Sequence, residues 1–274
     1  MRLTVNQTNL SKALSLVGRA VNSQTTLPVL NNILLATDGD RLKLSATNRE
    51  IAITCWIGAS VEDDGAITVP ARTISEYVNG LPGGEIISLK LTERTQTLSV
   101  KSGKFSANIK GIDHHEYPLV PGVTETMPAI AFDPDILRAT IDRVAFAASS
   151  DENRPTLTGV YVEMKATGVT MAATDGFRLS VATLPHDYSG DDVNYVIPAS
   201  SLSEVARMAT DANSVTMHTG QQQLIFAAES GGLWQRCEVV TELIDARFPD
   251  YRGTVLFTSH DRYFIERCAT AVIE

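Results

Sequence analysis

One short cluster of the sequence carries side chains of the kind that bind metals in proteins. Asp113, His114, His115 and Glu116 follow one another directly, and carboxylates and imidazoles are both ligands of zinc. Four consecutive side chains cannot all converge on one ion, because neighbouring residues point in different directions. We therefore predict a solvated loop before Tyr117 and no metal site.

A second group of residues is of the kind that binds phosphate, but it does not make up a complete phosphate site. The only Gly-Lys pair, Gly103-Lys104, is followed by Phe105 and lacks the upstream glycine of a phosphate-binding loop. Ser230-Gly231-Gly232 indicates a turn. The sequence also shows no apolar strand that ends in Asp-Glu, and no Ser/His/Asp or Cys/His set. We predict no catalytic residue, no cofactor and no enzymatic activity.

Length and composition are typical of a globular protein. The 274 residues are 43% hydrophobic and 20% charged, so two domains with real cores are expected. No signal peptide or membrane-spanning run is found, and the three distant cysteines suit a reducing cytoplasm. The net charge of −9 argues against a surface that grips nucleic acid tightly, although a local basic face can exist within an acidic chain.

The strongest signal is an internal repeat. A shift of 127 residues places the apolar positions of 3–21 over those of 130–148, and Pro28 over Pro155. A shift of 128 places 69–77 over 197–205, and Tyr117-Pro118 corresponds to Phe248-Pro249. Solenoid repeats are much shorter, so this period predicts two duplicated domains.

Each half has the same predicted plan, an α+β arrangement of two helices packed on a mostly antiparallel sheet. In the first helix the apolar residues from Leu10 to Val21 follow helical spacing, with Thr8 as its N-cap and Asp133 or Asp135 as the cap of its counterpart. The second helices are predicted at Arg72–Asn79 and Ser200–Ala209. Strands are predicted at Asn32–Ala36, Arg41–Ala46, Ile87–Leu91, Thr97–Lys101, Gly159–Glu163, Gly168–Ala173, Ser214–His218 and Gln223–Ala228, after short first strands at Leu3–Val5 and Ile130–Phe132.

Four motifs in this order carry a family resemblance: TLPVLNNILL (26–35), TVPAR (68–72), AATDGFRLSV (172–181) and ARFPDYRG (246–253). Over about residues 1–254 the chain resembles the bacterial DNA polymerase III beta subunits, the replicative sliding clamps. The resemblance implies clamp domains at 1–120 and 129–254, with a linker at 121–128. It also implies domains joined edge to edge, with helices toward duplex DNA and sheets outward. Subunits of the family have three such domains and close as a homodimeric ring. Here we expect the third domain to be absent, and a closed ring to be out of reach.

A ring holds DNA by topology, so an acidic exterior is compatible with this role. Lys12 and Arg19 lie seven residues apart, opposite the apolar stripe of the first helix. Each of the other three predicted helices also carries arginine. Taken singly, such residues are ordinary surface charges, but together they predict a DNA-facing set: Lys12, Arg19, Arg72, Arg138, Arg143 and Arg207.

In the family, polymerase III, the clamp loader and other proteins with a clamp-binding motif insert a short hydrophobic peptide beside the second domain. The residues that match this groove here are Leu157, Thr174, Gly176, Phe177, Arg178, Leu179 and Pro249. Phe177 departs from the family, which often has histidine there, and Leu157 and Leu179 could instead be ordinary strand core. Because the family's third domain adds groove walls, we expect only half of the groove.

The last residues, 255–274, resemble another family. The stretch SHDRYF, with His260, is similar to the histidine switch of ABC-F type ATPases, which implies a strand followed by an amphipathic helix, or a disordered tail. Without a phosphate-binding loop, His260 cannot bind ATP usefully. Fusion, misassembly or design of the chain would each produce such a junction.

The leading hypothesis is therefore a non-catalytic, cytoplasmic processivity clamp without a membrane partner. Two other hypotheses stay open: a fragment of an ABC-F ATPase, and a duplicated scaffold that binds an unrelated ligand. Nucleotide turnover and capture of clamp-binding peptides distinguish the three.

Overall fold

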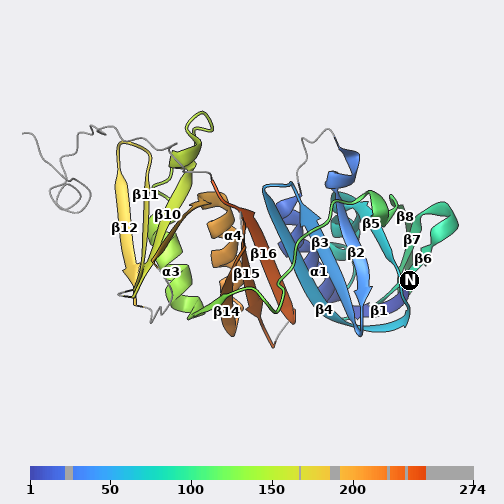
Figure 1. The fold of residues 1–274 in the computed structure, drawn as a ribbon. Coiled ribbons are helices and arrows are strands. Elements are labelled where there is room, and N and C mark those ends of the chain that lie inside the picture. The colour runs from blue at the N-terminus through green and yellow to red at the C-terminus, as the bar shows by residue number, and fades with distance from the viewer. Residues whose placement is uncertain (22–26, 167, 186–191, 221–222, 232–233, 245–274) are drawn as a thin grey trace, which may run out of the picture.

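The computed structural model describes residues 1–21, 27–166, 168–185, 192–220, 223–231 and 234–244. It shows two α+β units, as predicted (Figure 1). The first unit holds helices α1 (Gln7–Val17) and α2 (Ala71–Asn79), and the second holds α3 (Pro134–Ala145) and α4 (Ala199–Ala209). The predicted second helices thus agree with the structure to within one residue.

The first unit is built from two sets of antiparallel strands. One set has the order β8-β7-β6-β1, and the other has the order β5-β2-β3-β4. The long strand β4 pairs with both β3 and β1, so it joins the two sets. The strands are β1 (Arg2–Asn6), β2 (Asn32–Asp38), β3 (Arg41–Thr47), β4 (Ile51–Asp63), β5 (Ala66–Pro70), β6 (Ile86–Thr92), β7 (Thr97–Ser102) and β8 (Phe105–Lys110).

The second unit repeats both strand orders, as β16-β15-β14-β9 and β13-β10-β11-β12. The strands are β9 (Ala129–Phe132), β10 (Gly159–Lys165), β11 (Gly168–Thr174), β12 (Leu179–Leu184), β13 (Val193–Pro198), β14 (Ser214–Thr219), β15 (Gln223–Glu229) and β16 (Arg236–Glu242). The matching orders agree with a duplication. The strands that the sequence did not predict are β4, β5, β8, β12, β13 and β16.

The helices pack as the apolar spacing predicts. Leu10, Leu14 and Val17 of α1 are at most 1% exposed, and Leu137, Ile141 and Val144 of α3 are equally buried. All of them belong to one core that also includes the inward side chains of both strand sets. The apolar stripe of each helix therefore lies against the sheet.

Two details at the ends of α1 differ from the prediction. Asn6, and not Thr8, is the N-cap, because its side-chain oxygen accepts from the backbone N–H groups of Thr8 and Asn9. The apolar stripe continues to Val21, but α1 ends at Val17 and a 3₁₀ turn follows, where Gly18 weakens helix propagation.

Of the two N-cap residues predicted as alternatives for α3, Asp133 is the cap. The 3₁₀ turns are η1 (Gly18–Ala20), η2 (Pro28–Asn31), η3 (Glu93–Thr95), η4 (His114–Glu116) and η5 (Pro155–Thr158).

The two units join edge to edge, as the family resemblance implies. Strand β16 pairs with β4 in antiparallel register, from Arg236 opposite Trp56 to Thr241 opposite Ile51. One continuous sheet therefore spans both units. The chain between the units crosses this joint (Figure 1), and Val120, Val123 and Met127 pack against Ala52, Ile225 and Val240.

Among the described helices, none has the length and apolar character needed to span a bilayer. Pro249, His260 and the segment 255–274 lie outside the described residues. The predicted strand and helix of that segment stay predictions.

Candidate nucleic-acid interface and partner groove

The six cations of the predicted DNA-facing set lie on the helices or directly beside them. Lys12 lies on α1 and Arg19 on η1, while Arg72 lies on α2. Arg138 and Arg143 lie on α3, and Arg207 lies on α4. All six side chains are at least partly exposed. Five of the six cations thus lie on the predicted helices, whereas Arg19 lies on the 3₁₀ turn that follows α1.

Two of these cations form ion pairs across the joint between the units. Lys12 Nζ lies 2.6 Å from a carboxylate oxygen of Asp211, just after α4, and Arg19 Nε lies 3.6 Å from Glu204 of α4. The joint strands β4 and β16 carry α1 and α4 on the same side of the sheet, because only helices on one side can form these contacts. Arg207 also pairs with Glu204, at 3.0 Å.

The remaining cations pair within their own helices, with one exception. Arg72 pairs with Glu76 at 2.7 Å, and Arg138 lies 3.4 Å from Asp135. Hydrogen bonding to Glu76 raises the pKa of Arg72, with the charge of Glu76 adding to the effect. For Arg143 no ion pair is found within the described part of the chain.

The four described helices and the residues that flank them, which we call the helical face, carry no net charge. Six cations and six carboxylates lie on the helices or in the residues that flank them, whereas the whole chain carries −9. The excess of negative charge therefore lies elsewhere in the chain. The carboxylates are Glu76, Asp133, Asp135, Asp142, Glu204 and Asp211.

Apart from Pro249, which lies outside the described residues, the residues of the predicted peptide groove lie on or beside two neighbouring loops of the second unit. Thr174 ends β11 and Leu179 begins β12, where the two face each other across the strand pair. Leu157 lies on η5, before β10. The loops are adjacent, because a side chain at Gly176 would come within 3.9 Å of the Arg154 guanidinium. Leu157 and Leu179 are both half-buried.

Asp175 holds the turn between β11 and β12 in shape. Its carboxylate accepts from the backbone N–H groups of Phe177 and Arg178, at 2.9 and 3.0 Å. These bonds lower the pKa of Asp175, and the guanidinium of Arg178 lowers it further. Gly176 has φ = +92°, a conformation in which a side chain would be strained.

The same turn presents an aromatic and a cation to solvent. Phe177 is 95% exposed, and Phe146, at the end of α3, is 60% exposed. The Arg178 guanidinium lies 5.4 Å from the centre of the Phe146 ring. Sequence reasoning did not single out Phe146, whose position after α3 resembles an ordinary helix terminus.

The structure also places the residues that resembled a metal or phosphate site. The ligand atoms of Asp113, His114 and His115 lie within 4.8 Å of one another, so three of the four consecutive side chains do come together. The Asp113 carboxylate accepts from the backbone N–H of His115, which lowers the pKa of Asp113. Gly103 has φ = +53° in the turn between β7 and β8, so Gly103-Lys104 is a hairpin turn.

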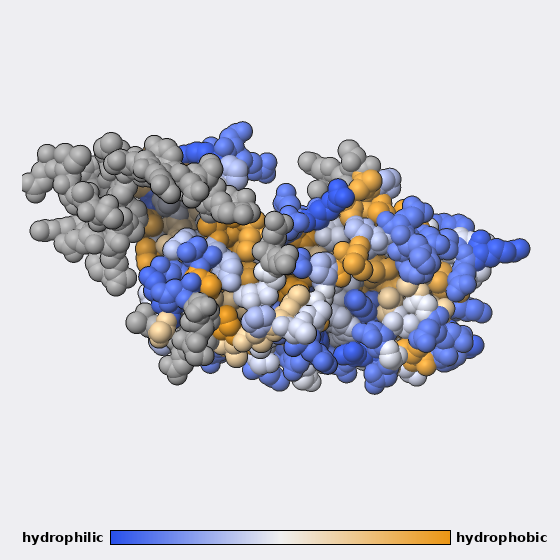
Figure 2. Space-filling model, in the orientation of Figure 1, coloured by the Kyte–Doolittle hydropathy of each residue, from blue (hydrophilic) through white to orange (hydrophobic). Residues whose placement is uncertain are grey.

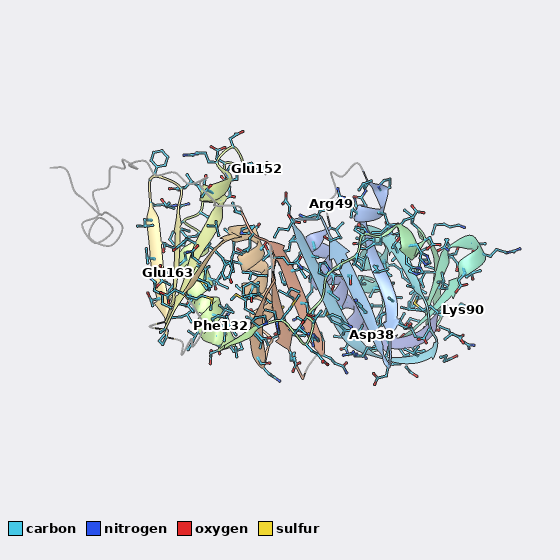
Figure 3. All side chains as sticks on the ribbon, in the orientation of Figure 1. Asp38, Arg49, Lys90, Phe132, Glu152 and Glu163 are labelled. Carbon is cyan, nitrogen blue, oxygen red and sulfur yellow. The ribbon has the colours of Figure 1, made fainter. Side chains whose placement is uncertain are left out.

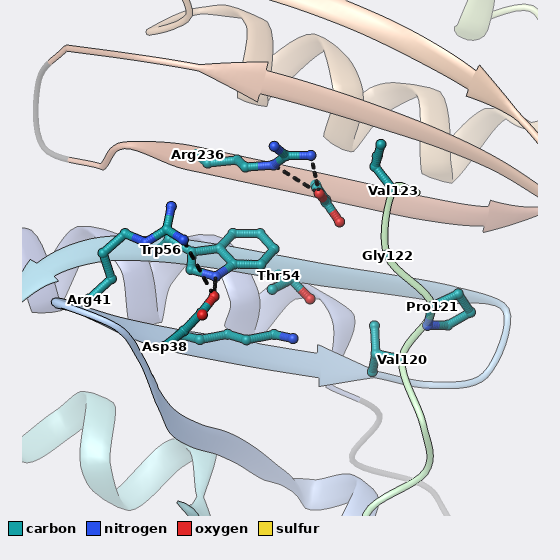
Figure 4. A pocket seen from close by; sticks show the side chains of 11 residues that line it. Asp38, Arg41, Thr54, Trp56, Val120, Pro121, Gly122, Val123 and Arg236 are labelled. Atoms are coloured by element: carbon teal, nitrogen blue, oxygen red, sulfur yellow. Dashed lines mark hydrogen bonds and ion pairs between the residues drawn. The ribbon is translucent and has the colours of Figure 1, made fainter. Parts of the chain in front are cut away.

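Sequence reasoning missed a polar cavity of about 280 Å³ over the joint (Figure 4). Trp56 Nε1 donates to Asp38 at 2.7 Å, and Lys43 and Arg236 place their cations 5.4 and 5.8 Å from the ring centre of Trp56. Arg236 pairs with the buried Glu238 at 2.7 Å. Val120 and the linker residues 121–123 close one side. The contact of Arg236 on β16 with the Trp56 ring on β4 adds to the β4–β16 pairing on the outer side of the joint.

Comparison with known proteins decides the family. Residues 1–121 match the family model "DNA polymerase III beta subunit, N-terminal domain", and residues 131–250 match "DNA polymerase III beta subunit, central domain". The beta sliding clamp of Caulobacter vibrioides is 32% identical over 261 residues, which cover 93% of this chain and 68% of the relative. The chain belongs to the beta sliding clamp family.

Other beta sliding clamps give the same result. The beta sliding clamp of Synechocystis is 34% identical over 250 residues, covering 82% of this chain and 63% of that protein. The DNA polymerase sliding clamp structure from Bacillus subtilis has a TM-score of 0.83 at 28% identity, covering 91% of this chain and 66% of that one. The chain thus spans about two thirds of the length of these beta sliding clamps.

Proposed function

We propose that the chain works as a DNA sliding clamp, a non-catalytic processivity factor that encircles duplex DNA in the cytoplasm and tethers a replicative polymerase. In this proposal residues 1–120 and 129–254 are two clamp domains, linked by 121–128. The helices face the DNA and the sheets face outward. Membership of the beta sliding clamp family and the arrangement of the helices support the proposal.

One observation carries it: a single sheet runs through both units, and helices of both units lie beside each other on one side of it. Strands β4 and β16 make the sheet continuous, and Lys12 and Arg19 connect α1 to the region of α4. The sheet therefore carries helices of both units along one side. Such a surface would contact the DNA backbone without reading its sequence.

The neutral charge of this face suits a protein that slides. Each cation that neutralises a DNA phosphate releases counterions, so a strongly basic face would bind DNA tightly and in a salt-dependent way. Here most cations are already paired with carboxylates. Weak phosphate contacts would allow movement along the duplex, whereas in the complete rings of the family topology retains the DNA.

A charge-neutralisation experiment tests the DNA-facing set. Replacing Lys12, Arg19, Arg138 and Arg143 with alanine should lower the slope of log affinity against log salt, by up to about 0.9 for each DNA phosphate that the protein no longer neutralises. The affinity of each variant for duplex DNA is measured between low and moderate salt by fluorescence anisotropy.

A matched variant loses the same charge elsewhere. Lys90, Lys101, Lys104 and Lys110 are all exposed on β6, β7, β8 and the turn between β7 and β8. Figure 3 shows Lys90 at that end of the molecule, away from the joint. Alanine at these positions should leave the salt slope unchanged. Equal slopes for the two variants would contradict the helical face as the DNA contact.

We also propose that the two loops of the second unit bind a short hydrophobic peptide of polymerase, clamp loader or another partner. Leu157 and Leu179 offer apolar contacts, and Arg178 offers one cation held in place by Asp175. Thr174, Gly176 and Phe177 shape the rim, and Pro249 completes the predicted set outside the described residues. Such a groove combines apolar walls with a few polar anchors.

Peptide titration tests this groove. Arg178→Ala should weaken binding of a fluorescent clamp-binding peptide about tenfold, because a charged hydrogen bond is removed. Lys165→Ala, at the opposite end of β10, removes a cation that pairs with Glu163 and should bind the peptide normally. If both variants bind like the unaltered chain, Arg178 has no part in the groove.

A further inference from the structure

Two cysteines lie opposite each other across the strand pair that joins the units. Cys55 of β4 and Cys237 of β16 are directly paired in register. Both are free thiols, and they are 0% and 1% exposed. Residues directly opposite in an antiparallel pair point to the same side of the sheet. Here that side is the shared core, which contains both cysteines.

The hydrogen-bond pattern of the joint shows which type of pair the cysteines occupy. Glu242 N–H donates to Glu50 C=O at 3.0 Å, so these two residues form a hydrogen-bonded pair. Such pairs alternate along an antiparallel ladder, and Cys237 lies an odd number of residues from Glu242. Cys55 and Cys237 therefore form a non-hydrogen-bonded pair, in which Cα atoms lie about 4.5 Å apart. A disulfide needs a Cα separation of about 4.4–6.8 Å.

The thiols are already in contact. A hydrogen bond with Cys55, and burial in the core, raise the pKa of Cys237 well above its ordinary value. A protonated thiol is a poor nucleophile, so the pair should react slowly while the joint stays closed. Two reduced thiols are also the state expected in a reducing compartment.

We propose that Cys55 and Cys237 form a reversible disulfide that links the two units when the protein meets a peroxide. One thiolate attacks a peroxide oxygen, the O–O bond breaks, and a sulfenic acid and water form. The other thiolate attacks the sulfenic sulfur, the S–S bond forms, and a second water leaves. The two sulfurs give up two electrons to the peroxide, and the two thiol protons end in the two waters.

The link would close the joint covalently. Without it, the units are held by the β4–β16 ladder, the packed linker and exposed ion pairs such as Lys12–Asp211. All of these can open and close reversibly. A disulfide between Cys55 and Cys237 would prevent β4 and β16 from separating until a thiol reduces it.

The test uses the full chain with Cys268→Ser, so that only these two thiols remain. The folded protein is treated with hydrogen peroxide, unfolded, alkylated and digested. We expect a mass lower by two hydrogens, loss of both alkylation sites, and one Cys55–Cys237 peptide that dithiothreitol releases. The thermal unfolding temperature should rise on oxidation and fall again on reduction. The variant with Cys55→Ala and Cys237→Ala in addition should show no shift.

A second variant keeps the result interpretable. Ile53 and Val239 form the next non-hydrogen-bonded pair on the same side of the joint, and they are also buried. Ile53→Cys and Val239→Cys, in a chain without the natural cysteines, report whether peroxide reaches this part of the core. Linkage of that pair, without linkage of Cys55 to Cys237, would overturn the proposal. The proposal would also be overturned if neither pair links in the folded protein under conditions that fully oxidise the thiols of the guanidinium-unfolded chain.

Discussion

At the scale of single residues, Tyr117 shows how one side chain ends the first unit. It is 8% exposed and packs with Val29 and Leu30. Its hydroxyl accepts from Thr47 N–H at 3.1 Å and donates to Asn32 C=O at 3.4 Å. The chain between the units starts immediately after it, so Tyr117 fixes where the linker leaves the first unit.

Because of Tyr117, the free energy of unfolding should depend on pH in the alkaline range. Burial raises its pKa to about 12, whereas an unfolded tyrosine titrates near pH 10. The contribution is therefore complete below pH 10 and is lost as the pH rises toward 12. We expect the unaltered chain to lose about 2 kcal/mol more than Tyr117→Phe between pH 9.5 and 12, as measured by urea unfolding. Equal losses would show that Tyr117 ionises as easily in the folded protein as in the unfolded chain.

At the scale of elements, the start of α1 depends on Asn6. Its side-chain oxygen accepts from Thr8 N–H at 2.9 Å and from Asn9 N–H at 3.4 Å. The Thr8 hydroxyl instead accepts from Gly84 N–H at 3.2 Å. Both residues are good N-cap types, and only the path of β1 into α1 decides between them.

Two alanine variants distinguish these roles. Asn6→Ala should lower the free energy of unfolding by about 1 kcal/mol, because two N–H groups at the helix start lose their acceptor. Thr8→Ala removes only the hydroxyl's bonds with Gly84 N–H and the Gln7 side chain, and it should cost about half as much or less. Urea unfolding followed by circular dichroism measures both. A larger loss for Thr8→Ala would identify Thr8 as the cap.

At the scale of the whole molecule, the joint between the units is the decisive feature. It combines the β4–β16 ladder, ion pairs from α1 to α4, and the polar cavity around Trp56. The view in Figure 2 shows mainly hydrophilic residues over the end of the first unit that carries β6, β7 and β8. The ion pairs are exposed and so contribute at most about 1 kcal/mol each. The ladder, the shared core and the packed linker must therefore supply most of the cohesion.

Proline substitution tests the ladder. Val240 occupies a hydrogen-bonded position opposite Ala52, so Val240→Pro removes a backbone hydrogen bond to β4 and should cost about 1–3 kcal/mol. We expect calorimetry to show the two units unfolding in separate transitions.

Ser106→Pro is the control for Val240→Pro, because it places proline on a strand that does not join the two units. Gly111 N–H donates to Gln96 C=O, so by alternation the N–H of Ser106 points away from β7. On this outer strand proline is tolerated when its nitrogen faces solvent. Ser106→Pro should therefore retain a single transition. A single transition for Val240→Pro as well would mean that the ladder does not couple the units.

The sequence by itself determined the features that are encoded within a few neighbouring residues. The helical spacing of Leu10, Leu14 and Val17 predicted both the helix and its buried face, and the repeat predicted two units of one plan. The motif at 172–181 carried much of the family resemblance. Local patterns of this kind are readable because side-chain periodicity follows backbone geometry.

Only the tertiary structure decided the features that depend on residues far apart in the chain. These include the pairing of β4 with β16, the partners of Lys12 and Arg19, and the position of Cys55 opposite Cys237. A strand or a charge carries no local mark of its distant partner. Which edges meet depends on how the whole core packs, and the joint is formed by that packing.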